Sequence, residues 1–225
     1  MTVLEPVLET KPKTIEYPER DGQPMADNTK QFRWIMTIQG GLDALFANRA
    51  DVFVAGDLLW YPVEGDNKTR AAPDALIVFG RPKGDRSAYL QWQENGVAPQ
   101  VVFEVLSPGN TVPEMTRKFA FYDRYGAEEY YLYDPDHNEL SGWIRTEGRL
   151  NTIESMNGWV SPKLGIRFDL SGEELKLIRP DGLPFETYTE LAARAEQELR
   201  HAERERQRAE KLAAQLRALG VEPEA

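Results

Sequence analysis

The sequence predicts an α/β (α+β) fold in which a mixed sheet is flanked by helices and followed by a helical extension. Three observations predict it: short apolar stretches of strand character fill the middle of the chain, only one interval between them has helical spacing, and the composition beyond residue 185 changes to Ala, Glu, Arg and Leu. A chain of 225 residues with 41% hydrophobic residues can bury one core, whereas a second full-sized domain would be cramped. We therefore predict an arm over residues 1–27, an α/β domain over 28–185 and a charged helical tail over 186–225.

The predicted arm is polar and rich in proline, with Pro6, Pro12, Pro18 and Pro24. Such a composition cannot bury enough apolar surface to order itself, so we interpret the segment as a tail or a covering arm. Immediately after it, apolar residues recur at helical spacing from Asn28, a candidate N-cap, to the neighbourhood of Asn48. This pattern predicts an amphipathic first helix.

Five apolar stretches then have strand character, namely 52–61, 75–79, 87–93, 101–106 and 130–133. Between the last two we predict a helix from Glu114 to Tyr125, because Pro113 is a helix-start signal and Gly126 a helix-stop signal. Further short strands are predicted around 140–145, 166–170 and 175–179, with a tight turn over 179–182. We interpret these later strands as a meander that closes the sheet.

The predicted tail has a heptad seam, formed by Ala192, Ala195, Leu199, Ala202, Arg206, Ala209, Ala213 and Leu216. Alanine dominates the seam and Arg206 interrupts it, so we expect a helical coiled-coil extension with weak self-association. Between Glu190 and Arg217 the tail carries six acidic and seven basic side chains, which is typical of a self-paired surface rather than of a DNA-binding arm. A solvated helix without a partner is the alternative.

Composition excludes several classes of protein. The chain has no Cys, which excludes disulfides and thiolate zinc sites, and it lacks the motifs of hydrolase triads and nucleotide cofactors. No apolar run could span a bilayer and no signal-peptide segment precedes Lys13, so we expect a cytoplasmic protein without a membrane partner. The net charge of -10 disfavours tight DNA binding but leaves metal-dependent hydrolysis open, because divalent cations screen carboxylates.

Two carboxylates and one lysine are the candidates for chemistry. Glu104 is the only charge in a stretch that otherwise has the character of a buried strand, and burying an ionised carboxylate is costly unless it is paired or bound to a metal. Asp74 stands at the start of another predicted strand. With Lys118 beside them, these carboxylates could hold Mg²⁺ or Mn²⁺ through oxygen, while the lysine orients a water. The alternatives are a salt bridge for Glu104 and a turn or cap role for Asp74.

A series of ordered motifs carries a resemblance to a known family. They are Ala72-Pro73-Asp74, the stretch 98–108, Lys118-x-x-x-Tyr122, the stretch 126–130 and Asp134-Pro135. Over roughly residues 28–185 the chain resembles the Uma-two family of restriction-endonuclease-like proteins, in the PD-(D/E)XK nuclease superfamily. The resemblance implies a restriction-endonuclease-like fold, with the site at an edge of the sheet, and a metal-dependent endonuclease that hydrolyses DNA.

The resemblance also implies roles for individual residues. Asp74 and Glu104 match the catalytic, metal-binding carboxylates, and Val105 would offer its backbone carbonyl to Mg²⁺ (or Mn²⁺). The superfamily pattern has its lysine two residues after the acidic residue, where this chain has Leu106. Lys118, on the following helix, matches the position from which the family supplies it instead. A plain ion pair between Lys118 and Glu114, one helical turn apart, is the alternative for that lysine.

Several residues are second-tier candidates. Asp57 and Glu114 could add carboxylates near the metal, although an Asp beside Gly is more often a turn residue. Arg86, Tyr89 and Trp92 could contact nucleic acid, or they could simply pack a hairpin. Other aromatic residues, Tyr122 and Tyr130, we assign to the core.

Three functions remain open at this point. The first is the metal-dependent endonuclease, with DNA as its partner and a homodimer expected by analogy with nucleases that cut both strands as two-fold dimers. The second is a nuclease-fold module that binds or regulates without catalysis. The third is an interaction protein that assembles through its C-terminal helix.

Overall fold

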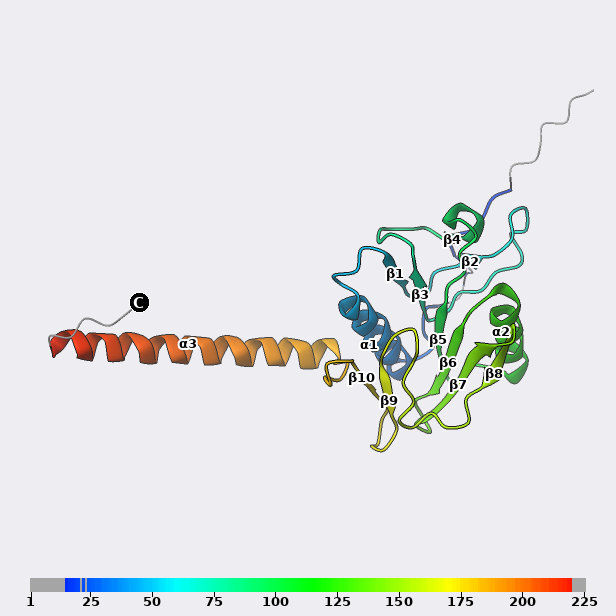
Figure 1. Ribbon diagram of the computed structural model, residues 1–225. Helices are drawn as coiled ribbons and strands as arrows, with labels where there is room; N and C mark the ends of the chain where they lie inside the picture. Colours follow the sequence, from blue (N-terminus) through cyan, green and yellow to red (C-terminus); the bar gives the residue numbers. More distant parts are fainter. Residues whose placement is uncertain (1–14, 21, 23, 220–225) are drawn as a thin grey trace, which may run out of the picture.

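The computed structural model describes residues 15–20, 22 and 24–219, and it contains a six-stranded mixed sheet with helices on its faces (Figure 1). The strand order is β1-β3-β5-β6-β7-β8. These strands are β1 (Val52–Ala55), β3 (Ala75–Phe79), β5 (Val101–Val105), β6 (Glu129–Asp134), β7 (Glu139–Thr146) and β8 (Arg149–Thr152). Only β5 and β6 run parallel among these neighbours; the other pairs are antiparallel. The predicted fold class is confirmed.

The first helix, α1 (Thr29–Leu45), covers one face of the sheet over β1, β3 and β5. The side chain of Asn28 accepts a hydrogen bond from the backbone N–H of Gln31 at 2.9 Å, which confirms the predicted N-cap. Apolar residues at helical spacing, among them Ile35, Ile38 and Leu42, are buried against the sheet. The sequence pattern therefore predicted both the start and the buried face of this helix.

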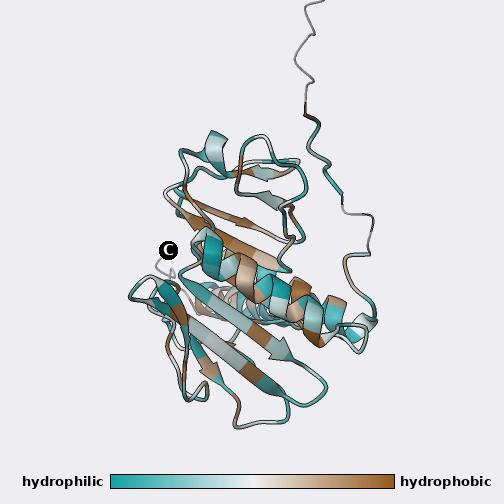
Figure 2. Cartoon of the chain, turned by 90° about the vertical axis from the view of Figure 1, so that its right-hand side faces the viewer, coloured by the Kyte–Doolittle hydropathy of each residue, from teal (hydrophilic) through white to brown (hydrophobic). Residues whose placement is uncertain are grey.

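The second helix, α2 (Val112–Tyr125), lies in the crossover between the parallel strands β5 and β6. It starts two residues earlier than predicted, because Thr111 and Glu114 form a capping box around its first turn. It ends at Gly126, whose φ of 100° is in the left-handed region. Two adjacent parallel strands must be joined by a crossover that carries the chain back across one face of the sheet, and α2 forms this crossover. Figure 2 views the sheet from the side of α2.

The side chains of the inner strands point alternately into two apolar cores, one on each face of the sheet. Ile77 and Phe103 belong to the cluster beneath α1, whereas Leu76 and Val102 belong to the cluster beneath α2. Because side chains in a strand alternate between faces, Glu104 shares the face of Val102. The predicted buried carboxylate therefore points toward α2.

Two predicted strands differ from the structure. The stretch 52–61 is divided, because the chain leaves β1 through Asp57, whose φ of 49° is left-handed, before forming β2 (Trp60–Tyr61). The stretch 87–93 becomes the short β4 (Tyr89–Leu90) and a 3-10 helix, η1 (Gln91–Glu94). The strands β2 and β4 pair with each other in a separate two-stranded sheet.

The prediction that the last strands close the main sheet was wrong. The strands β9 (Arg167–Asp169) and β10 (Lys176–Ile178) form their own antiparallel pair, and Phe168 and Leu177 pack into the core beneath α1. The main sheet is closed instead by β8, which follows β7 through a tight turn at Glu147 and Gly148 with φ values of 53° and 81°. The expected turn at 179–182 is present, with Gly182 N–H donating to Arg179 C=O at 2.9 Å.

The described part of the N-terminal arm lies against the domain. The ring of Tyr17 packs on Tyr61 and on Trp92, with centroid distances of 5.3 and 5.0 Å. Its hydroxyl accepts a hydrogen bond from the backbone N–H of Gly65 at 2.7 Å. Pro6 and Pro12 of the predicted arm lie outside the described residues.

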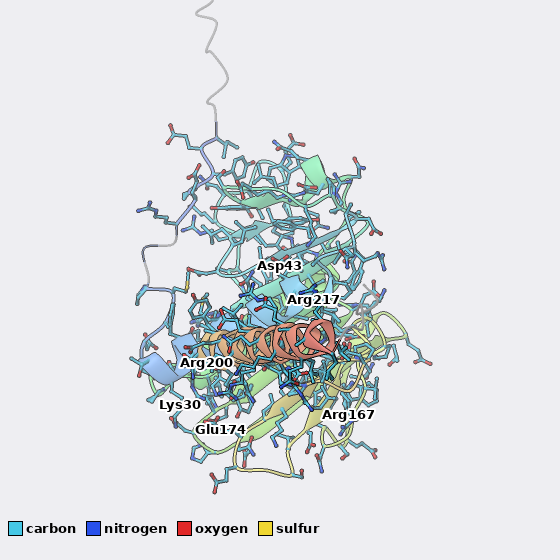
Figure 3. The ribbon with its side chains drawn as sticks, turned by 90° about the vertical axis from the view of Figure 1, so that its left-hand side faces the viewer. Lys30, Asp43, Arg167, Glu174, Arg200 and Arg217 are labelled. Atoms are coloured by element: carbon cyan, nitrogen blue, oxygen red, sulfur yellow. The ribbon has the colours of Figure 1, made fainter. Side chains whose placement is uncertain are left out.

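The last helix, α3 (Tyr188–Ala218), begins with a capping box between Thr187 and Glu190 and has no buried residue. It projects away from the domain (Figure 1), and Figure 3 looks along it from its free end. Within the described ranges, no helix combines the length and the apolar character needed to cross a membrane.

Candidate active site

Asp74 and the end of β5 are joined by antiparallel pairing. Ala75 lies opposite Phe103, so Asp74, just before β3, comes level with the last residues of β5. Its Oδ2 accepts a hydrogen bond from the backbone N–H of Val105 at 2.6 Å. Burial, followed by the nearby charge of Glu104, raises the pKa of Asp74 well above its ordinary value. The two carboxylates are therefore close enough to repel each other.

Glu104 is buried, with 2% of its surface exposed, and both of its oxygens have partners. Its Oε2 lies 2.8 Å from Lys118 Nζ, and its Oε1 accepts a hydrogen bond from the hydroxyl of Tyr122. Lys118 and Tyr122 are four residues apart, so they lie on the same face of α2. The salt bridge considered as an alternative for Glu104 is thus present, with Lys118 itself as the partner.

The charge states around Glu104 follow from these contacts. Burial lowers the pKa of Lys118, but the charge and hydrogen bond of Glu104 outweigh burial, so this pKa lies above its ordinary value. Burial first, and then Glu104, raise the pKa of Tyr122 well above its usual range. Lys118 is therefore cationic and Tyr122 remains a hydrogen-bond donor at neutral pH.

The backbone of Val105 is held on both sides. Its carbonyl accepts a hydrogen bond from Gln31 Nε2 at 2.8 Å, and Gln31 Oε1 accepts one from the Asp27 N–H at 2.8 Å. Sequence reasoning missed Gln31, because an amide on a helix carries no signal of its distant partner. It also assigned Tyr122 to the core alone, although the spacing from Lys118 could have placed its hydroxyl beside Glu104.

A cavity of about 370 Å³ opens beside Asp74. Its lining residues are Pro24, Met25, Ala26, Asp27, Gln31, Asp57, Ala72, Asp74, Gly109, Asn110, Glu114, Arg117 and Lys118. Four acidic and two basic side chains therefore surround it, so acidic groups outnumber basic ones in the lining. Asp57 and Glu114, the expected accessory carboxylates, both reach this cavity.

Glu114 does not take the role of an ion-pair partner for Lys118. It accepts a hydrogen bond from Asn110 Nδ2 at 3.2 Å and caps the first turn of α2 with Thr111, while Lys118 turns to Glu104. Sequence reasoning also missed Asp27 and Arg117, because only the tertiary fold brings the arm and the outer face of α2 to one cavity.

The prediction that the site lies at an edge of the sheet was wrong. The site lies within the sheet. β5 is the third of the six strands, and Glu104 and Val105 stand at its carboxyl end. The parallel crossover through α2 places β6, β7 and β8 beyond β5, which makes β5 an inner strand.

Arg86, Tyr89 and Trp92 are not among the residues that line the cavity beside Asp74. Arg86 pairs with Glu94 at 2.7 Å, and the buried Tyr89 donates its hydroxyl to the Val97 carbonyl at 2.8 Å. Trp92 packs on Tyr17. These contacts stabilise the segment around β4, and a role in nucleic-acid contact remains a prediction.

The oxygen donors at the site fit a hard divalent cation. Mg²⁺ is commonly bound by one or two carboxylates, with water completing the shell. Burial is the main cause that raises the pKa of Asp74, and the repulsion from Glu104, which adds to it, is the kind of interaction that a cation relieves. Over the described parts of the chain, no group of three or more His, Cys, Asp or Glu could hold a metal. Asp74 and Glu104 fall short of such a group, and a metal bound by these two carboxylates and the Val105 carbonyl stays a prediction.

A mixed sheet that brings an Asp before one strand, a Glu within the next and a Lys from the following helix to one place defines a nuclease-like α/β protein. The chain belongs to the Uma2 family, described as "Putative restriction endonuclease", which matches residues 8–180. The family resemblance found in the sequence is thereby confirmed.

Among solved structures, the chain is similar to a protein from Anabaena variabilis ATCC 29413, described as "a putative nuclease belonging to DUF820". The two are 14% identical, with a TM-score of 0.45, and the similarity covers 60% of this chain and 72% of that chain. No curated protein matches the chain.

Proposed function

We propose that this protein is an endonuclease that hydrolyses phosphodiester bonds of DNA with the help of Mg²⁺ or Mn²⁺. The observation that carries the proposal is the convergence of Asp74, Glu104 and Lys118. Three separate segments bring them together, with Val105 N–H bound to Asp74 at 2.6 Å and Lys118 Nζ bound to Glu104 at 2.8 Å. Family membership supports the same reaction class.

In this proposal the two carboxylates and the carbonyl of Val105 hold the metal. A bound divalent cation would stabilise the negative charge that develops on the phosphate and would acidify a water. The cationic Lys118 would orient the attacking water or stabilise charge on the phosphate, from its position beside Glu104. Tyr122 fixes the orientation of Glu104 by donating its hydroxyl to it. Asp57 and Glu114, which line the same cavity, are proposed as accessory carboxylates.

The acidic balance of the chain bears on how DNA would bind. With a net charge of -10, the protein would hold DNA weakly without metal, since phosphates are normally neutralised by a basic surface. We propose metal-dependent binding, in a homodimer in which each protomer addresses one strand.

A second candidate is a nuclease-fold module that does not cleave. It is favoured by the saturated contacts of the donor set: Glu104 is occupied by Lys118 and Tyr122, and the Val105 carbonyl by Gln31. A site whose donors are already paired inside the protein can be stable without a metal. Metal affinity separates the two candidates.

The test is cleavage of supercoiled, linear and single-stranded DNA by the purified chain with and without Mg²⁺ or Mn²⁺. We expect metal-dependent cleavage that is lost in Glu104→Gln, Glu104→Ala and Asp74→Asn, each verified to be folded by circular dichroism. Glu64→Gln is the matched control, because Glu64 is exposed and does not line the cavity.

Two results would overturn the assignment. Cleavage that persists in both Glu104 variants would place the chemistry elsewhere. Absence of cleavage on every substrate, together with no heat of Mg²⁺ or Mn²⁺ binding by calorimetry, would favour the non-catalytic module.

A further inference from the structure

Over the described residues, the hydrogen bonds and ion pairs of α3 join it to the residues just before it or to itself. Arg194 pairs with Glu186 at 2.8 Å, and Glu190 caps the helix with Thr187. Beyond this point the ion pairs of the described residues join side chains of α3 to each other, such as Arg200 with Glu196. Figure 3, in which Arg200 and Arg217 are labelled on the helix, shows it pointing away from the strands behind it. The domain therefore does not account for the side-chain pattern of the helix.

One face of α3 is apolar along its length. The heptad seam from Ala192 to Leu216 is widened by Leu191 and Leu212, which flank it. Leu199 is 62% exposed, and Leu191, Leu212 and Leu216 are 47%, 51% and 38% exposed. A helix that leaves leucines at coiled-coil positions in water has the pattern of one that packs against another helix.

The positions on either side of this seam are acidic. With Ala192 at position a, the e positions hold Glu196, Glu203, Glu210 and, at the C-terminal end, Arg217, and the g positions hold Glu198, Glu205 and Leu212. The basic side chains at 194, 200, 204, 208 and 211 lie on the outer face, at positions b, c and f. Between residues 194 and 211, apart from Arg206 in the seam, the charges of α3 are therefore sorted by face, with Glu beside the seam and Arg or Lys away from it.

This arrangement of charges disfavours pairing of α3 with the same helix of a second copy of the chain. In a parallel pair the g position of one helix meets the e position of the other, which places Glu198 opposite Glu203 and Glu205 opposite Glu210. In an antiparallel pair g meets g and e meets e, which again brings Glu to Glu over the middle of the helix. Like charges at these positions oppose pairing, so the expected self-association of α3 is weakened in both the parallel and the antiparallel orientation.

We propose that α3 docks a partner helix whose own seam is built from small and Leu-type residues and whose flanking positions carry Lys or Arg. Such a partner would pair a cation with each flanking glutamate, while the apolar face from Leu191 to Leu216 would be covered. Arg206, at the centre of the seam and 3.7 Å from Glu210 on the same helix, favours a small or acidic residue at the facing position, because a large apolar residue there would remove the guanidinium from water. This inference does not depend on the proposed nuclease activity.

The chain itself supplies the probe. A full-length variant with lysine in place of all five flanking glutamates (E196K, E198K, E203K, E205K and E210K) keeps the apolar seam and reverses the charge on both sides of it. We expect light scattering to show that an equimolar mixture of this variant and the wild-type chain has twice the mass of either alone. The association should be about tenfold weaker at 1 M than at 0.1 M salt, since exposed charge pairs are screened.

Two controls isolate the seam. Adding L199E and L216E to the lysine variant places charges at exposed seam positions and should abolish the mass increase. A second variant has the same change in net charge, with lysines at exposed acidic positions of the domain, namely E64K, D85K, E139K, E154K and E173K. Mixing it with the wild-type chain should leave the mass unchanged.

Each other outcome overturns the proposal. No mass increase with the lysine variant would show that the seam does not dock a basic helix. An increase that survives L199E and L216E would show that association occurs elsewhere on the molecule. A fall in the mass of the wild-type chain when it alone receives L199E and L216E would identify a second copy as the partner.

Discussion

Lys118 Nζ lies 2.8 Å from Glu104 Oε2, although Glu114 stands one helical turn away from Lys118 on the same helix. The lysine therefore compensates the charge of Glu104, which is 2% exposed, rather than that of Glu114, which is partly exposed. Breaking a buried pair costs more than breaking an exposed one, because it leaves a charge without a counter-ion. The stability of the domain and the geometry of the candidate site thus depend on the same contact.

Lys118→Met should destabilise the protein by about 3–5 kcal/mol, because Glu104 would remain buried without its cation. The free energy of unfolding in urea measures the change. The double variant Lys118→Met, Glu104→Gln should recover much of the loss, since the buried charge is then removed as well. A double variant as unstable as the single one would show that the pairing is not the source of the effect.

Tyr122→Phe should cost about 1–3 kcal/mol, because Glu104 Oε1 loses the hydroxyl that donates to it. Tyr125→Phe, on the same helix, is the matched control and should change the unfolding free energy by less than about 0.5 kcal/mol, as expected for a partly exposed side chain. Equal effects of the two substitutions in urea unfolding would contradict a special role for the Tyr122 hydroxyl.

Glu94 should make stability depend on pH. Its hydrogen bond with Arg86 is the main cause that lowers the pKa of Glu94 below its ordinary value of 4.5, and Arg81 acts in the same direction. A depressed folded-state pKa contributes stability above the unfolded-state value, and this contribution is lost as pH falls through the folded-state value. Glu94→Gln should therefore be less stable than the wild-type chain by about 1–2 kcal/mol at pH 7.

The difference in unfolding free energy between the wild-type chain and Glu94→Gln should shrink as the pH falls below 4.5, where Glu94 of the wild-type chain takes up its proton. Thermal unfolding recorded from pH 7 downward measures it. A difference that stays constant over this range would mean that the ion pairs with Arg81 and Arg86 are not its origin.

Adjacent glycines in α1 should respond in opposite ways to alanine. Gly40→Ala should stabilise the protein by about 0.5–1 kcal/mol, because an added Cβ meets nothing within 4 Å and alanine favours helix. Gly41→Ala should destabilise it by about 1–3 kcal/mol, because the Cβ would collide with the ring of Phe185. Melting temperatures that move in the same direction would show that Phe185 does not pack on α1 as described.

Local signals explain what the sequence predicted. Asn28 and Gly126 act on their own neighbours, so they predicted where α1 begins and α2 ends, while Pro113 predicted the start of α2 to within two residues. Ala75–Phe79 and Val101–Val105 were predicted because buried inner strands are short apolar runs. The candidate site followed from the same logic, since Glu104 is a charge within such a run.

Long-range pairing explains what the sequence did not predict. The pairing of Trp60 with Tyr89 joins two segments that are each only two residues long, too short for a periodic pattern. Gln31 reaches Val105 across 74 positions of sequence, and no local signal marks such a bond. The sheet position of the site was mispredicted for the same reason, because strand order depends on the crossover through α2.

The reach of α3 has a mechanical consequence. Its 31 residues contain neither Gly nor Pro, so it behaves as a stiff rod of about 46 Å at about 1.5 Å per residue. That length equals about 13 base pairs of duplex DNA at about 3.4 Å per pair. A partner bound near the free end of α3 would be kept at a fixed distance from the cavity beside Asp74, while a partner bound near Thr187 would lie against the domain.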